Sequence, residues 1–242
     1  MPTYAFANTN ALSSALNEFV AKKSKEAIAD HGAFSVAVSG GSLPKLLAAD
    51  LKNNKQVDFT RWHIFWADER CVPLDDGDSN YNELKKTGLL DHVPDSNVHT
   101  INASFGKDAE KAAVDYQAQL QEYFGQLPSI DLILLGMGPD GHCCSLFPGH
   151  PLLNETTRWV APIVDSPKPP PERITLTYPV VNNAKAVAFV TAGEGKQDML
   201  QKILEQPDLQ LPCQRVKPKG PVYWFVDQAA AGKVQKDNIS EY

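Results

Sequence analysis

The sequence predicts an α/β fold in which a single doubly wound, mostly parallel sheet carries helices on both faces. Two observations predict it. Short apolar runs alternate with longer segments of helical periodicity, and several of the runs are apolar throughout, as strands buried on both faces are. The chain has 242 residues, of which 43% are hydrophobic, so it can enclose a large core. We therefore expect one domain covering residues 1–242.

The first part of the chain contains two strand–helix alternations. Residues 11–30 carry apolar side chains at helical spacing behind the capping residues Thr9 and Asn10, which predicts a long first helix. Phe34–Val38 is a short apolar run between turn residues and predicts a buried strand. The elements that follow are the turn Ser39–Ser42, a helix with Pro44 in its first turn and an apolar stripe to Leu51, the strand Trp62–Trp66 and the helix Ser79–Leu90.

The same alternation continues to the C-terminus. The predicted elements are the strand Val98–Ile101, the helix Asp108–Phe124, the strands Leu132–Leu135 and Ala186–Val190, the helix Glu194–Leu204, the strand Val222–Val226 and a closing helix Asp227–Lys236. The Pro-rich segment Asp165–Glu172 breaks the pattern, because proline fits neither a helix interior nor a central strand. We interpret it as a rigid surface loop rather than an interdomain linker, since apolar runs continue on both sides of it.

The bulk composition excludes several classes of protein. The formal net charge is −6, and no block of like charges marks a surface for nucleic acid or for an anionic membrane. The N-terminus lacks the pattern of a signal peptide, and no apolar run is long enough for a membrane span. The four cysteines form no C-x-x-C pair and are expected to be reduced thiols. We expect a cytoplasmic monomer whose partner is a small molecule, with no nucleic acid or membrane partner.

The segment Asp131–His150 is the most informative stretch, because an apolar run ends there in three glycines. Gly136, Gly138 and Gly141 spell G-x-G-x-x-G, the fingerprint of dinucleotide-binding sites. That fingerprint requires a long helix from the third glycine, whereas prolines and a glycine follow within about two turns. We therefore expect no nucleotide cofactor, and we interpret the glycines as clearing space at a strand end.

Asp140 and His142 follow these glycines and are the predicted catalytic pair. Histidine is suited to proton transfer near neutral pH, and a carboxylate two residues away can orient it. The alternative is a turn aspartate beside a structural histidine. Zinc binding by His142, Cys143, Cys144 and His150 is not expected, because their spacing matches no common zinc motif. We expect no metal.

Three other segments carry candidate anion-binding groups. Gly40, Gly41 and Ser42 form a turn before a predicted helix, where backbone N–H groups can bind phosphate. Arg70 ends the strand that precedes it, and its planar guanidinium suits phosphate. Arg173 follows the Pro-rich segment, and Lys196 opens a later helix. Each cation taken alone is equally compatible with a solvated surface charge, but together they can form one cationic pocket.

The chain resembles the 6-phosphogluconolactonase family over nearly its whole length. The resemblance is carried by SVAVSGGSLPKLL, WHIFWADERCVPLDDGDSNY, DLILLGMGPDGHCCSLFPGHPLL, DSPKPPPERITLT, TAGEGK and VYWFVDQAA, in that order. The related glucosamine-6-phosphate deaminases have a similar D-G-H segment that continues into Asn-Glu-Pro. Here the continuation is Ser145–Gly149, without an acid, and Asp68–Arg70 differs from the deaminase segment as well. Both differences favour the lactonase.

The resemblance implies a modified Rossmann-like fold of the NagB/RpiA type and hydrolysis of 6-phospho-D-glucono-1,5-lactone in the oxidative pentose phosphate pathway. It implies that His142 is the catalytic residue and that the Ser-Gly turn, Arg70 and Lys196 bind the substrate. Arg173 is our own addition to that set, and Cys143 and Cys144 are interpreted as small packing residues. A deaminase or isomerase and a non-catalytic sugar-phosphate sensor remain the alternatives.

Overall fold

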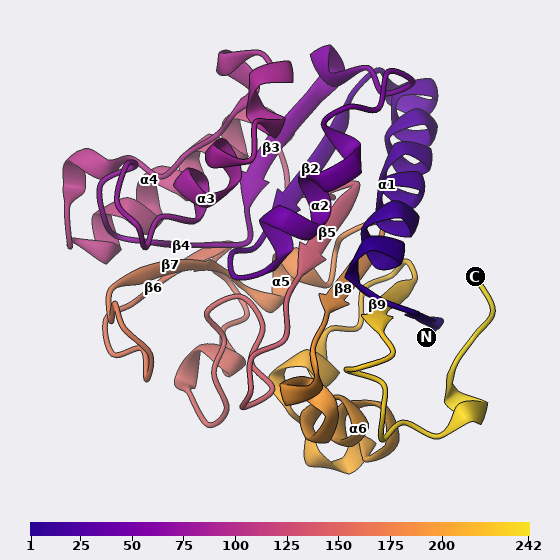
Figure 1. Cartoon of the computed structure of the whole chain (residues 1–242). Helices are drawn as coiled ribbons and strands as arrows, with labels where there is room; N and C mark the ends of the chain where they lie inside the picture. The colour runs from indigo at the N-terminus through magenta and orange to yellow at the C-terminus, as the bar shows by residue number, and fades with distance from the viewer.

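A computed structural model describes all 242 residues and is built on a six-stranded parallel sheet (Figure 1). The strand order is β1–β9–β8–β5–β2–β3, and every neighbouring pair is parallel. The strands are β1 (Thr3–Phe6), β2 (Phe34–Val38), β3 (Trp62–Trp66), β5 (Leu132–Leu135), β8 (Val187–Thr191) and β9 (Val222–Asp227). The predicted mostly parallel sheet is confirmed, and β2, β3 and β5 have the predicted bounds.

Side chains that alternate along each strand fill two cores, one on each face of this sheet. Val36 of β2 packs in the core that contains α1 (Thr9–His31) and α2 (Leu43–Leu51). Its neighbour Ala37 packs in the opposite core with α4 (Ala109–Phe124) and α6 (Gln197–Glu205). The short helix α5 (Tyr178–Val181) joins this second core. Both faces of the sheet are therefore covered by helices, which explains why its central strands are mostly apolar.

A small antiparallel sheet lies beside the main one and was not anticipated from the sequence. It has the order β4–β7–β6, with β4 at Asp68–Arg70, β6 at Val160–Ile163 and β7 at Arg173–Leu176. The Pro-rich loop 165–172 connects β6 to β7, as a surface loop would. These strands contain three or four residues each, too few to show a clear period of two. The edge strand β1 went unrecognised for the same reason.

Four predicted elements are wrong in kind or extent. Val98–Ile101 is not a strand, because it joins β3 through only one bridge, at Val98 and Ile64, and one backbone hydrogen bond, from His99 N–H to the Ile64 carbonyl at 2.9 Å. The helix predicted for Ser79–Leu90 is α3 (Asn80–Lys86), followed by a 3-10 turn, because Gly88 adopts a left-handed conformation with φ 86°.

The closing helix predicted for Asp227–Lys236 is also wrong, since turns occupy this segment. The Asp227 carboxylate accepts hydrogen bonds from the N–H groups of Ala230, at 2.8 Å, and Gly193, at 3.0 Å. The bond from Ala230 fixes the turn after β9, and the bond from Gly193 ties that turn to the segment that follows β8. Likewise, the helix predicted from Glu194 opens as a 3-10 turn and becomes α-helical only at Gln197.

The strand order places a topological switch point between β2 and β5. The chain moves from β2 outward to β3 on one side, and from β5 to β8 and β9 on the other. In open α/β sheets, ligands bind beyond the carboxyl ends of the strands at such a point. Here that position is occupied by the Ser39–Ser42 turn and by the glycine-rich segment after β5. No helix in the chain combines the length and hydrophobicity needed to cross a membrane.

Candidate active site

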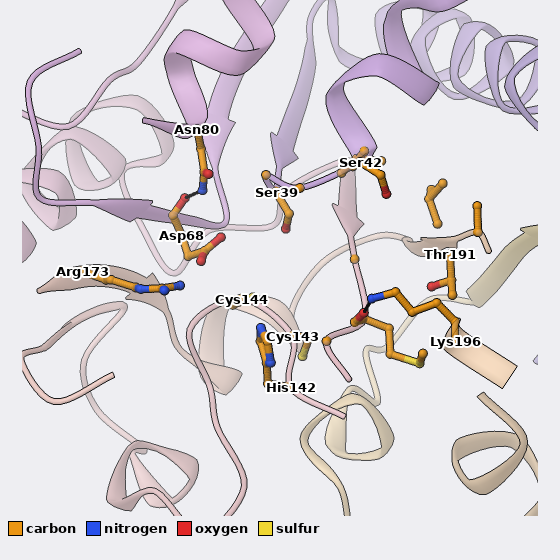
Figure 2. Close-up of a pocket in the computed structure, with 18 of the residues that line it drawn as sticks. Ser39, Ser42, Asp68, Asn80, His142, Cys143, Cys144, Arg173, Thr191 and Lys196 are labelled. Carbon is orange, nitrogen blue, oxygen red and sulfur yellow. Dashed lines mark hydrogen bonds between the residues drawn. The ribbon is translucent and has the colours of Figure 1, made fainter. Parts of the chain in front are cut away.

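A polar cavity opens at this switch point, beyond the carboxyl ends of β2, β5 and β8 (Figure 2). Its walls come from segments that are far apart in the sequence. The lining residues are Ser39, Gly40, Gly41, Ser42, Leu43, Asp68, Arg70, Asn80, Gly136, Met137, Gly138, His142, Cys143, Cys144, Arg173, Val190, Thr191, Ala192 and Lys196. All of the predicted site residues line this cavity except Asp140, which contacts His142 instead.

His142 and Asp140 form a hydrogen-bonded pair at the cavity wall. Nδ1 of His142 lies against Oδ1 of Asp140, and the same oxygen accepts the backbone N–H of His142 at 3.2 Å. A proton on Nδ1, donated to the carboxylate, leaves Nε2 unprotonated and able to accept a proton. The carboxylate therefore selects the tautomer that a general base requires.

The electrostatic surroundings of this pair keep the imidazole neutral. Burial lowers the pKa of His142 below its ordinary value, and the hydrogen bond and charge of Asp140 oppose that shift only in part. For Asp140, burial acts to raise the pKa, but the hydrogen bond to His142 and its charge prevail and lower it. At neutral pH the pair is thus an uncharged imidazole beside a carboxylate.

Gly138 provides the space that the His142 ring occupies. A Cβ atom at this position would lie 2.0 Å from Nδ1 and 2.1 Å from Cε1 of His142, and 2.9 Å from Oδ1 of Asp140. The interpretation that a glycine clears space for Asp140 and His142 therefore holds at Gly138. The chain continues from Gly138 mainly as turns, with a 3-10 segment at Pro151–Asn154, and no α-helix opens at the third glycine, Gly141.

Lys196 and Arg70 bring positive charge to the cavity. Nζ of Lys196 donates to the Met137 carbonyl at 2.7 Å, which directs the ammonium toward the segment after β5. Burial lowers the pKa of Lys196, and the nearby charge of Lys168 lowers it further. Nη1 of Arg70 donates to the Asp78 carbonyl at 3.0 Å. Neither cation is paired with a carboxylate.

Three buried polar atoms of the lining residues have no hydrogen-bond partner in the protein: Ser39 Oγ, Thr191 Oγ1 and Arg70 Nε. Leaving such a group unpaired costs on the order of 1–3 kcal/mol, so native structures satisfy nearly all of them. Together with the unpaired cations, they indicate a cavity that binds a polar, anionic ligand.

The Ser-Gly turn places the N-terminus of α2 at the cavity. Ser42 caps α2 without a side-chain hydrogen bond, so the first N–H groups of the helix are free to meet an anion. Gly41 takes a left-handed conformation with φ 71°. Gly40 is needed for a different reason, because a Cβ there would lie 2.1 Å from Oδ1 of Asn80.

A buried carboxylate fixes Arg70 and the start of α3. Glu69 accepts the backbone N–H groups of Arg70 and Asn80, both at 2.8 Å, and that of Tyr81 at 2.9 Å. Burial raises the pKa of Glu69 to about 7, although these three hydrogen bonds act to lower it. Glu69 lies behind the cavity wall and orients Arg70 without contacting the cavity itself.

Arg173 was predicted as a phosphate ligand, but most of the N–H donors of its guanidinium are hydrogen-bonded to backbone carbonyls of the protein. Nε donates to the Pro170 carbonyl at 3.0 Å, and Nη2 donates to the carbonyls of Lys168 at 2.9 Å and Pro169 at 3.2 Å. Only Nη1 is left without a partner, so the guanidinium has little capacity to bind phosphate with two donors. Its main contacts hold the Pro-rich loop.

Sequence reasoning missed three of the polar residues at the cavity. Asp68 accepts a hydrogen bond from the Ser145 hydroxyl at 2.8 Å, and Asn80 Nδ2 donates to the Asp68 carbonyl at 3.0 Å. Asp68 and Thr191 each follow an apolar run, which is a signal that could have identified both. Asn80 lies within a helix and reaches the cavity only through the fold.

All four cysteines are free and buried, as expected. Cys143 and Cys144 pack in the core beneath the cavity, in agreement with a packing role. No group of three or more histidine, cysteine, aspartate or glutamate side chains is arranged to hold a metal ion.

Known proteins of one family are similar to the chain over nearly all of its length. Residues 7–224 match the family model described as glucosamine-6-phosphate isomerases/6-phosphogluconolactonase. The probable 6-phosphogluconolactonase of Schizosaccharomyces pombe is 42% identical, over 100% of this chain and 99% of its own length. The 6-phosphogluconolactonase of Rattus norvegicus is 45% identical, over 93% and 91%. The crystal structure of 6-phosphogluconolactonase from Thermotoga maritima superposes with a TM-score of 0.82 at 29% identity, over 93% of this chain and 99% of that one.

Proposed function

The chain belongs to the glucosamine-6-phosphate isomerase/6-phosphogluconolactonase family, and on that premise we propose that it hydrolyses 6-phospho-D-glucono-1,5-lactone to 6-phospho-D-gluconate. Its similarity to 6-phosphogluconolactonases along the whole chain makes it a lactone hydrolase of that family. The reaction is the second step of the oxidative pentose phosphate pathway. The observation that carries the proposal is the His142–Asp140 pair in a cavity of unpaired cations.

In the first step, His142 acts as the general base. Water attacks the carbonyl carbon of the lactone, and its proton passes to Nε2 of His142, the nitrogen that Asp140 leaves unprotonated. A new carbon–oxygen bond forms, and the π electron pair of the carbonyl moves to its oxygen. Asp140 stabilises the resulting imidazolium, because the carboxylate lies directly against Nδ1.

In the second step, His142 returns the proton. The electron pair on the oxyanion reforms the carbonyl, and the bond from that carbon to the ring oxygen breaks. The ring oxygen takes the proton from His142, and the new carboxylic acid loses its own proton to solvent. One lactone and one water thus become a carboxylate and a proton, and His142 is neutral again.

The phosphate of the substrate is proposed to bind the unpaired donors of the cavity. Lys196, Arg70 and the N–H groups of the Gly40–Ser42 turn supply positive charge and hydrogen-bond donors to the same cavity as His142. An anchored phosphate holds the reactive ring at a fixed distance from the base, which lowers the entropic cost of reaching the transition state.

The proposed function is tested by measuring lactone disappearance at neutral pH with the purified chain, corrected for spontaneous hydrolysis. We expect stoichiometric appearance of 6-phosphogluconate and one proton per turnover. Release of ammonia from glucosamine 6-phosphate, without lactone hydrolysis, would assign the chain to the deaminases. Binding of 6-phosphogluconate without any acceleration of lactone loss would make it a sensor.

Replacing Arg70 with alanine is expected to raise KM about tenfold or more with a smaller change in kcat, since a charge-assisted hydrogen bond is worth roughly 1.5–3 kcal/mol. Steady-state kinetics on the lactone measure both constants. Arg61→Ala is the matched control, because Arg61 is exposed and precedes β3 at the end of the sheet opposite Arg70. An unchanged KM in Arg70→Ala would remove Arg70 from the phosphate site.

A further inference from the structure

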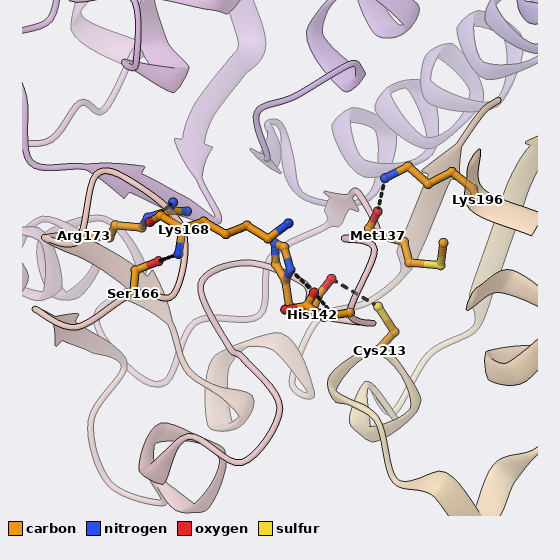
Figure 3. A network of polar contacts seen from close by, with 8 residues as sticks. Met137, His142, Ser166, Lys168, Arg173, Lys196 and Cys213 are labelled. Carbon is orange, nitrogen blue, oxygen red and sulfur yellow. Dashed lines mark hydrogen bonds and ion pairs between the residues drawn. The ribbon is translucent and has the colours of Figure 1, made fainter. Parts of the chain in front are cut away.

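Lys168 extends from the Pro-rich loop toward the imidazole of His142 (Figure 3). The side chain is half-buried, although it stands on a surface loop. Its positive charge acts on two groups of the cavity wall, since it lowers the pKa of His142 and that of Lys196. The side chain thus points toward the proposed base, and its charge acts on both His142 and Lys196.

The loop that carries Lys168 is held by the buried guanidinium of Arg173. Three consecutive carbonyls, those of Lys168, Pro169 and Pro170, accept hydrogen bonds from Nη2 and Nε of Arg173 at 2.9–3.2 Å. The Lys168 N–H donates to the Ser166 hydroxyl, and the Ser166 N–H donates to the Pro171 carbonyl, both at 3.2 Å. These bonds fix the backbone on both sides of Lys168.

Phe147 joins this clamp to the catalytic histidine. Its ring packs against the His142 ring with a centroid distance of 4.5 Å. On the loop side, the guanidinium carbon of Arg173 lies 5.8 Å from the Phe147 centroid. The proposed base and the residue that holds the loop thus pack against one aromatic ring.

The ammonium of Lys168 has no ion pair and no hydrogen bond within the protein. Two carboxylates, Asp140 and Asp68, face His142 as well, but Asp140 is bound to Nδ1 and Asp68 to the Ser145 hydroxyl. An ammonium group without a counter-ion is stabilised when an anion comes near it. Lys168 is therefore available to a negative charge that forms near His142.

We propose that Lys168 is a catalytic residue whose ammonium stabilises the negative charge on the lactone oxygen while His142 activates water. The inference rests on the proposed function, because it concerns the same carbonyl group. Water must lie within hydrogen-bond reach of Nε2 to be activated, and the attacked carbonyl is bonded to that water in the transition state. A cation held near the imidazole is consequently near the oxygen on which the charge develops.

The test compares the kinetics of Lys168→Met with those of the wild-type protein on the lactone. We expect kcat to fall by about 10²-fold with little change in KM, as for the loss of one oxyanion-stabilising donor. The acid limb of the pH profile of kcat/KM should also move to higher pH, because loss of a positive neighbour raises the pKa of His142. Lys55→Met is the control, since Lys55 is exposed and follows the C-terminal end of α2, away from the cavity.

A second variant, Arg173→Lys, tests the clamp. Lysine keeps the charge but lacks the planar donors that bind three carbonyls, so kcat should fall in the same direction. In the double variant Lys168→Met/Arg173→Lys, kcat should fall little below that of Lys168→Met, because both substitutions remove one function. If the factors by which the two substitutions lower kcat multiply in the double variant, Arg173 does not act through Lys168.

The outcomes separate this inference from the proposed function. A raised KM with unchanged kcat would make Lys168 a ground-state ligand of the phosphate and overturn the inference. Unchanged kinetics and an unchanged pH profile in Lys168→Met, with an active wild-type protein, would overturn the inference alone. A wild-type protein without lactonase activity would contradict the proposed function, and the titration of His142 by NMR would then still report whether the Lys168 charge lies beside it.

Discussion

Replacing His142 with alanine is expected to lower lactonase kcat by about 10²–10⁴-fold, the usual contribution of a general acid–base residue. The substitution removes the group proposed to accept the proton of water and return it to the ring oxygen. It also leaves the Asp140 carboxylate without the ring that it orients. KM should change less than kcat, because the anion-binding donors of the cavity are untouched. Initial rates at saturating lactone, corrected for spontaneous hydrolysis, measure the effect.

The chain contains a matched control for this substitution. His31 forms a second histidine–aspartate pair, with Nε2 at 2.8 Å from Oδ1 of Asp131. Asp131 directly precedes β5 and Asp140 follows it, so the two pairs lie at opposite ends of one strand. His31→Ala should retain normal turnover. Near-normal turnover in a folded His142→Ala protein would show that His142 is not the base.

Replacing Gly138 with alanine is expected to reduce kcat nearly as much as loss of the imidazole, by about 10²-fold or more. The added methyl group would occupy the position of Nδ1 and Cε1 of His142, at 2.0 and 2.1 Å. The imidazole must therefore rotate or move away, which breaks its contact with Asp140. Gly138 does not adopt a positive φ, so alanine fits its backbone conformation and the effect arises from the displaced ring.

Circular dichroism and thermal unfolding of Gly138→Ala establish that the protein remains folded, and kinetics then report the position of the base. Gly77→Ala is the control, because Gly77 is exposed, has open space around its Cα and also lacks a positive φ. Full activity in Gly138→Ala would mean that His142 functions from another rotamer, contrary to the geometry of the pair.

The central strands could be predicted from the sequence because the apolar composition that identifies each of them lies within a few consecutive residues. Leu132–Leu135 is apolar throughout and Phe34–Val38 is apolar apart from Ser35, as expected of strands covered on both faces. The short strands of the second sheet gave no such signal. Arg173–Leu176 becomes a strand because it pairs with Asp68–Arg70, roughly a hundred residues earlier in the chain, and not because of its own composition.

Much of the candidate site could be predicted in the same way. His142, Arg70 and Lys196 each follow the end of an apolar run or a glycine turn, and parallel strands bring such ends to one edge of the sheet. Arg173 shows the limit of that reasoning. Its position near the cavity was correctly anticipated, but its hydrogen bonds to the Pro-rich loop depend on a folded backbone that spacing alone does not reveal.

The sequence by itself determined the alternation of strands and helices, the parallel sheet and the glycine-flanked Asp140–His142 pair, because these depend on residues within a few positions of one another. Only the tertiary structure decided which polar groups meet across the cavity. Lys168 stands in a proline run with no periodicity. Arg173 binds the carbonyls of that run, and Phe147 packs against both Arg173 and His142, so the fold directs Lys168 toward His142. Contacts of this kind form between segments distant in the chain, where hydrogen bonding and packing rather than local pattern set the positions of side chains.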